Sequence, residues 1–161
     1  MKWFLVLLVL AIAVGWYWMI ATGTWADRAI AMHMRKASVS ATGEDMLSHL
    51  SDVRELVQRQ EEWMQRLAIV ARNPDAQTLR QAAAVTQQLY DAAQRVEQGE
   101  GTEGTGSQAE ALREAIRSRM GIPTGFLRPG QRTFWTVLFW ISLAGAAVTG
   151  LLSFVRSAAD F

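Results

Sequence analysis

The chain has 161 residues, of which 50% are hydrophobic, and its formal net charge is +1. This near-neutral charge excludes a strongly basic nucleic-acid-binding surface, and the lack of cysteine excludes disulfides and thiolate metal sites. Because the apolar excess is concentrated in two uncharged runs, one near each end, we expect an all-α membrane protein. Two transmembrane helices would flank an extramembrane domain.

The first segment, residues 1–23, is predicted to be transmembrane helix 1. Its apolar run carries no charge, Lys2 precedes it, and Trp16, Tyr17 and Trp18 form an aromatic cluster near its far end. A signal peptide is the competing interpretation, because a basic residue before an apolar core fits one as well. The run is longer than a signal-peptide core of about 7–15 residues, so we expect an uncleaved anchor.

Residues 24–43 are predicted to be a juxtamembrane amphipathic segment that ends in a short flexible connection. Thr24 and Asp27 have the spacing of a capping box, which would restart a helix after a glycine. Apolar residues such as Ile30 and Met34 then alternate with basic ones. This composition fits a helix on the membrane surface, and it equally fits a continuation of helix 1 into water.

Residues 44–98 are predicted to form a coiled-coil-like helical hairpin. Apolar residues recur in both halves at alternating steps of three and four, and Gln60 fills the one gap in the first seam. Asn73 as an N-cap and Pro74 in the first turn would start the second helix, although a kink in one long helix stays open. The seam residues are Leu50, Val53, Val57, Met64, Leu67, Leu79, Leu89 and Val96.

Residues 99–107 have the composition of a Gly-rich linker, and residues 108–132 are predicted to form a short helix and a re-entry loop. Gly99, Gly101 and Gly104 match the G-x-G-x-x-G spacing of dinucleotide-binding proteins. A predicted helix, not a strand, precedes these glycines, and glutamates between them would repel phosphates. We therefore expect no nucleotide site in the linker.

Transmembrane helix 2 is predicted at residues 133–156 and a short tail at 157–161. At about 1.5 Å per residue, its apolar run is long enough to cross a hydrocarbon core of about 30 Å. Small residues line this helix at spacings of four, and small residues let membrane helices approach closely. We expect a helix-packing interface with helix 1 or with another protein. Its residues are Ser142, Gly145, Ala146, Thr149, Gly150 and Ser153, with Ala11 and Gly15 on helix 1.

Candidates for chemistry are few. Asp45 and His49 lie one helical turn apart and His33 stands alone, which is too few ligands for a zinc site. Neither apolar run contains His, Asp, Glu, Lys or Arg, which argues against haem ligation by imidazole and against a proton relay within the membrane. We therefore expect no catalytic residue, no metal and no cofactor, and the protein is not expected to be an enzyme.

These features favour a non-catalytic accessory or structural subunit of a larger integral-membrane complex. Its partners would be membrane lipid and other membrane subunits, held through transmembrane helix 2 and the hairpin, with no nucleic acid and with a homo-oligomer left open. One alternative is a membrane-anchored sensor or regulatory protein that signals through a separate partner. Another alternative is a small pore or membrane-lysis protein, for which the spans offer no polar lining.

We expect a two-span protein of a bacterial inner membrane. Two rules conflict on the side that the loop domain faces. Basic residues near the spans are more frequent in the loop than at the outer ends, which favours a cytoplasmic loop. However, the loop is longer than the roughly 60 residues over which that rule works, and a short Lys-bearing N-terminus is itself usually cytoplasmic, which would place the loop on the other side. Between the two, we favour a cytoplasmic loop.

Overall fold

The structure is a computed structural model that describes residues 2–71, 74–98 and 105–159. Within these ranges the chain forms six α-helices and no strand, so the expected all-helical class is confirmed for the described residues. The helices are α1 (Lys2–Ala21), α2 (Thr24–Val39), α3 (Gly43–Ala71), α4 (Ala76–Glu97), α5 (Thr105–Ser118) and α6 (Pro129–Ala159).

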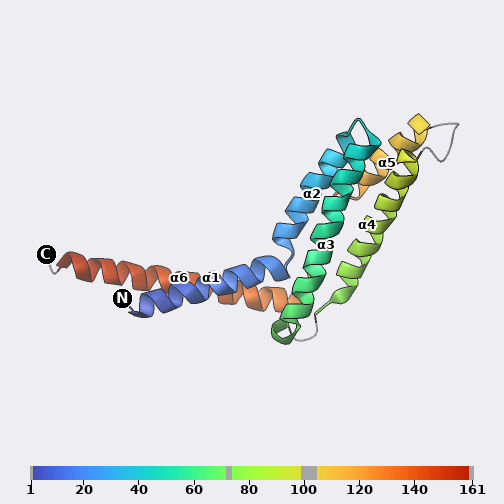
Figure 1. Cartoon of the computed structure of the whole chain (residues 1–161). Helices are drawn as coiled ribbons and strands as arrows, with labels where there is room; N and C mark the ends of the chain where they lie inside the picture. Colours follow the sequence, from blue (N-terminus) through green and yellow to red (C-terminus); the bar gives the residue numbers. More distant parts are fainter. Residues whose placement is uncertain (1, 72–73, 99–104, 160–161) are drawn as a thin grey trace.

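The helices divide into two parts, which we call the stalk and the bundle. The stalk consists of α1 and α6, which lie side by side in opposite directions and carry both chain ends at their far end (Figure 1). The bundle consists of α2, α3, α4 and α5. It is a closed ring, because α3 contacts α2 and α4, and α5 contacts the same two helices on the other side.

Each bundle helix buries one apolar face in a common core. The three-and-four spacing places those residues on one side of each helix, so four helices can enclose them together. Of the predicted seam residues, four are buried in this core: Leu50, Val53, Val57 and Leu89. Val96 is half-buried against it, and Leu79 of α4 is also buried but is not part of this cluster. The buried cluster also includes Ile30 and Met34 from α2, Met46 from α3, Leu112 and Ile116 from α5, and Ile122.

The segment after α1 is a separate helix with one buried face. Gly23 has a left-handed backbone with φ of 73°, which ends α1 and lets α2 leave in a new direction. Ile30 and Met34 are fully buried, because α3 and α5 pack over that face of α2, whereas Trp25 and Met32 are exposed. The buried face of α2 is therefore covered by protein.

The starts of α4 and α5 differ from those predicted. Asp75 is the N-cap of α4, with its side chain accepting a hydrogen bond from the Gln77 amide at 3.1 Å, and Pro74 precedes the helix. The predicted cap Asn73 lies outside the described residues. α5 already begins at Thr105, so residues 105–107 of the predicted linker are helical. Residues 99–104, with the three spaced glycines, lie outside the described residues.

A second apolar cluster joins the bundle to the stalk. It consists of Tyr17, Ile20, Ala21, Phe126 and Leu127, with Trp63, Met64, Leu67 and Trp135 packed against it. α3 has 29 residues whereas α2 has 16, so the last turns of α3 extend past the core of the bundle. Met64 and Leu67, predicted as seam residues of the hairpin, therefore pack at the stalk.

Two helices are long and apolar enough to cross a membrane. Their apolar windows are Phe4–Ala21 in α1 and Gly130–Leu152 in α6, and most of the side chains in both windows are not covered by the protein itself. The large apolar residues that face outward include Leu5, Val9, Ile12, Val137, Ile141, Val148 and Leu151. The stalk therefore presents a broad apolar surface to its surroundings.

Candidate functional site

One ridge of small residues on α6 packs against α1. A Cβ atom added to Gly15 would lie 2.7 Å from the Phe139 ring, and one added to Gly150 would lie 2.9 Å from the Phe4 ring. The glycines thus make room for aromatic side chains of the opposite helix. The other predicted residues on this side, Ala11, Ser142 and Ala146, are buried. Ser142 bonds to the Leu138 carbonyl of its own helix at 2.8 Å.

The other predicted ridge of α6 lies beside this interface. A Cβ atom at Gly145 would meet no atom within 4 Å. Thr149 is half-buried, and its hydroxyl donates to the Gly145 carbonyl at 2.8 Å, so its polar atom is satisfied within the helix. The side chain of Ser153 lies outside the described residues. Gly145 and Thr149 therefore form a small, apolar and open flank, which we call the second ridge.

Aromatic residues hold the bundle end of the stalk together. The Trp18 indole nitrogen donates to the Thr136 hydroxyl at 2.9 Å, and its ring stacks on Phe139 with centroids 5.9 Å apart. The Tyr17 ring lies 4.4 Å from that of Trp135. Tyr17 and Trp18, expected as interfacial anchors, thus pack against α6, whereas Trp16 is exposed as an anchor requires.

The carbonyl groups at the end of α1 are bonded by residues from other parts of the chain. The Gln60 amide on α3 donates to the Ile20 carbonyl at 2.6 Å, and the Phe126 and Leu127 amides donate to the Ala21 carbonyl at 3.0 and 3.3 Å. The last carbonyls of a helix have no partner within the helix. Gln60 is buried, which explains the polar residue in the seam of α3.

Asp27 carries a tertiary contact in place of the expected capping box. Its Oδ1 atom accepts from the Thr124 amide at 2.8 Å and from the Thr124 hydroxyl at 2.7 Å. The N-cap of α2 is Gly23, and the Thr24 hydroxyl bonds to that of Thr22 at 2.7 Å. We call this region, where Gly23 and Asp27 meet the loop before α6, the joint. Its bonds connect α2 of the bundle to the loop that leads into α6.

His33 does not stand alone, as the sequence suggested. It lies on α2 opposite His49 and Asp52 of α3, and the three offer ligand atoms within 4.8 Å of one another. Asp45, the expected neighbour of His49, instead accepts from the Thr42 hydroxyl at 2.8 Å, at the start of α3. Separation along the chain hid this cluster, because only the pairing of α2 with α3 brings its members together.

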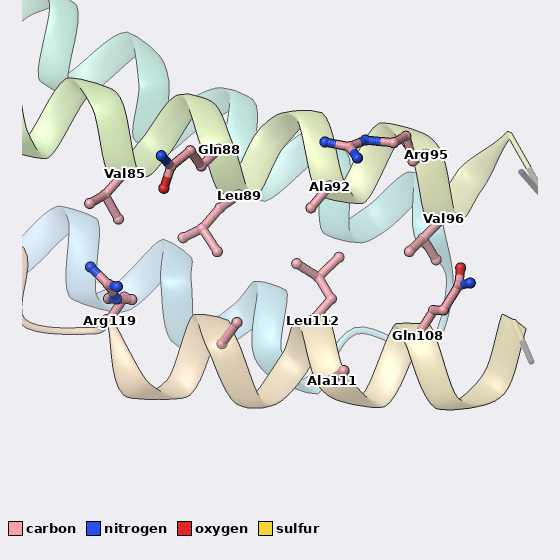
Figure 2. A pocket seen from close by; sticks show the side chains of 11 residues that line it. Val85, Gln88, Leu89, Ala92, Arg95, Val96, Gln108, Ala111, Leu112 and Arg119 are labelled. Carbon is pink, nitrogen blue, oxygen red and sulfur yellow. The ribbon is translucent and has the colours of Figure 1, made fainter. Parts of the chain in front are cut away.

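A groove of about 540 Å³ runs between α4 and α5 on the bundle surface. Figure 2 shows Leu89 and Leu112 pointing toward each other across it, with Arg95, Arg119 and the Gln108 amide nearer its edges. Its floor is the outer side of the bundle core. The groove brings together no acid, base and nucleophile that would indicate a reaction.

No protein-family model, no curated protein and no solved structure matches the chain.

Proposed function

We propose that this chain is a non-catalytic subunit of an integral-membrane complex, with α1 and α6 inserted in the membrane and the bundle held outside it. The stalk would anchor the protein, and the second ridge of α6 would bind a membrane helix of another subunit. A bacterial inner membrane is the expected location. Homo-oligomers are included, since a second copy could supply that helix.

Insertion is supported by the surface of the stalk. An exposed apolar surface of this extent is unfavourable in water, at about 25 cal/mol per Å² of apolar area. Lipid would cover it at no such cost. The polar backbone groups at the bundle end of α1 are bonded, and Trp16, Trp18, Arg128 and Arg132 lie near the bundle ends of the two apolar windows in the sequence.

The observation that carries the assembly proposal is the open second ridge. The ridge of α6 that contains Ala146 and Gly150 already packs against α1, so it cannot also bind a partner helix unless the stalk opens. Gly145 meets no atom within 4 Å, and Thr149 beside it is satisfied and small. In lipid no hydrophobic force drives helices together, so close approach at such small residues supplies much of the association energy.

Substituting Gly145 with Leu should remove the partner helix from the second ridge while leaving the stalk intact. The added side chain keeps the helix apolar and points away from α1, so insertion and folding should not change. The amount of each protein that co-purifies with the wild type in mild detergent should fall at least tenfold in the variant. The two forms are compared at equal abundance in the membrane.

Ala147→Leu is the matched control for Gly145→Leu. The two positions flank Ala146, each about 100° around the helix on opposite sides. Ala147 is exposed, and its substitution also adds bulk to a small residue without adding polarity. We expect the control to retain its partners. Equal partner sets in both variants would contradict the role of the second ridge.

A sensor is the second candidate, and the joint favours it. Gln60 of α3 is bonded to Ile20 of α1, and Asp27 of α2 is bonded to Thr124 in the loop that leads into α6, so a change in the bundle would move the stalk. A separate protein would have to receive the signal. A substitution of Gln60 distinguishes the two candidates, because assembly depends on the second ridge, whereas signalling depends on the contact between α3 and α1.

A further inference from the structure

Both histidines of the chain meet one carboxylate between α2 and α3. His33 comes from the middle of α2, and His49 and Asp52 lie one turn apart on α3. The sequence contains two histidines in all, so every imidazole of the protein lies in this one cluster. The side chains are partly covered, with 21%, 29% and 47% of their surfaces exposed for His33, His49 and Asp52.

The ligand atoms face one another without being hydrogen-bonded. The Nδ1 atom of His33 lies 3.0 Å from Oδ2 of Asp52, and the Nδ1 atom of His49 lies 3.9 Å from the same oxygen. Both Nδ1 atoms are nevertheless buried without a hydrogen-bond partner, and the 3.9 Å contact of His49 is too long to be a hydrogen bond. Buried nitrogens of this kind normally find a partner.

A metal ion would satisfy all three atoms at once. Zinc bonds of about 2.0–2.1 Å in tetrahedral geometry place neighbouring ligand atoms about 3.3 Å apart. The two histidine–Asp52 separations of 3.0 and 3.9 Å lie on either side of this value, and all three ligand atoms lie within 4.8 Å of one another, so the side chains must close by at most about 1.5 Å to hold one ion. Two imidazoles and one carboxylate are also a ligand set that zinc uses when a fourth position is left for water or another ligand.

The surroundings provide space for that fourth position. A groove of about 290 Å³ opens beside the cluster and is lined by His33 and Asp52 together with Trp25, Glu55 and Arg59. The positive charge of Arg59 would oppose a cation, but the Glu55 carboxylate pairs with it at 2.6 Å. His33 follows the first residue of α2 by nine positions, or about 14 Å of helix, so the cluster lies past the middle of α2 and away from the stalk.

We propose that His33, His49 and Asp52 bind one divalent transition-metal ion of the zinc type, with the fourth position open to the groove. The ion would join α2, which follows the first stalk helix in the chain, to α3. This site goes beyond the assembly function proposed above and does not depend on it. Imidazole and carboxylate together favour zinc or cobalt over calcium and magnesium, which prefer sites made only of oxygen.

The test is a titration of the full-length protein in detergent, purified with a tag that contains no histidine and stripped with EDTA. Cobalt(II) reports its own geometry, because tetrahedral coordination gives a strong visible absorption band, and zinc should displace it. We expect one ion per chain. Asp52→Asn and His33→Gln should each weaken binding at least tenfold, because each removes one of three ligands.

Glu62→Gln is the matched control, because it removes an exposed carboxylate of the same helix that pairs with Arg66 at 3.8 Å, outside this groove. It should bind cobalt as the wild type does. Circular dichroism verifies that each variant is folded. If a site variant is unfolded, the cobalt absorption spectrum of the wild type alone decides whether the ion binds. Absence of a saturable band in the wild type, or equal affinity in the site variants, would overturn the proposal.

Discussion

Replacing both Val57 and Leu89 with Asp is expected to unfold the bundle. Both side chains are buried in its core, on adjacent helices α3 and α4. A carboxylate buried there without a partner costs several kcal/mol, and two of them approach the total stability of a domain, about 5–15 kcal/mol. Circular dichroism of the full chain in detergent should show loss of the helical signal of the bundle.

The control changes Gln58 and Gln88 to Asp. Each follows or precedes a core position by one residue and is exposed, so the same charge is added to the same helices on their solvent side. Substitutions at such positions usually change stability by less than about 0.5 kcal/mol. If the core variant melted at the temperature of this control, the four helices would not share a core.

Gly23→Ala is expected to destabilise the joint by about 3 kcal/mol, the combined effect of a strained backbone and an overpacked contact. The φ of 73° is unfavourable for any residue with a Cβ atom. That atom would also lie 2.5 Å from the Gly125 nitrogen and 2.8 Å from the Thr124 carbonyl carbon, which are backbone atoms and cannot rotate away.

Hydrogen exchange measures this loss locally. The Phe126 and Leu127 amides donate to Ala21 across the joint, so they should exchange faster in the Gly23→Ala variant, and the melting temperature should fall. Gly121→Ala is the control, because a Cβ atom there meets nothing within 4 Å. Equal protection of both amides in the two variants would show that Gly23 does not determine the path between stalk and bundle.

The sequence predicted the positions of the helices along the chain better than it predicted what each helix packs against. Regular apolar spacing identified α3 and α4, because that spacing depends only on which side of a helix is covered. The same information cannot say what covers it. Ile30 and Met34 fit lipid, water-exposed helix ends or a protein core equally well, and the structure buries them against α3 and α5. Their step of four, which continues to neighbouring apolar residues of α2, was the available signal.

Contacts between distant segments were the parts that could not be predicted. Asp27 and Thr124 are far apart in the sequence, and so are Gln60 and Ile20, and each pair depends on how the bundle meets the stalk. His33 and His49 meet for a similar reason, through the register of α2 on α3. By contrast, Ala11, Gly15, Ala146 and Gly150 were expected at a helix-packing interface, because small residues at regular spacing already indicate close approach.

Labelling of single cysteines in sealed membrane vesicles tests insertion by both stalk helices most directly, and the native chain contains no cysteine that would interfere. Three variants place the thiol in the bundle, beyond the span of α6 and in the middle of α1: Gln81→Cys, Arg156→Cys and Ile12→Cys. All three positions are exposed. A membrane-impermeant maleimide is applied to vesicles of known orientation.

Because bundle and chain ends lie at opposite ends of the stalk, the account predicts that Gln81→Cys and Arg156→Cys react from opposite sides of the membrane. Ile12→Cys should react only after detergent is added, since lipid would cover it. The side on which Gln81→Cys reacts also gives the orientation of the bundle. Reaction of both outer positions from the same side, or of Ile12→Cys in intact vesicles, would contradict a two-span protein.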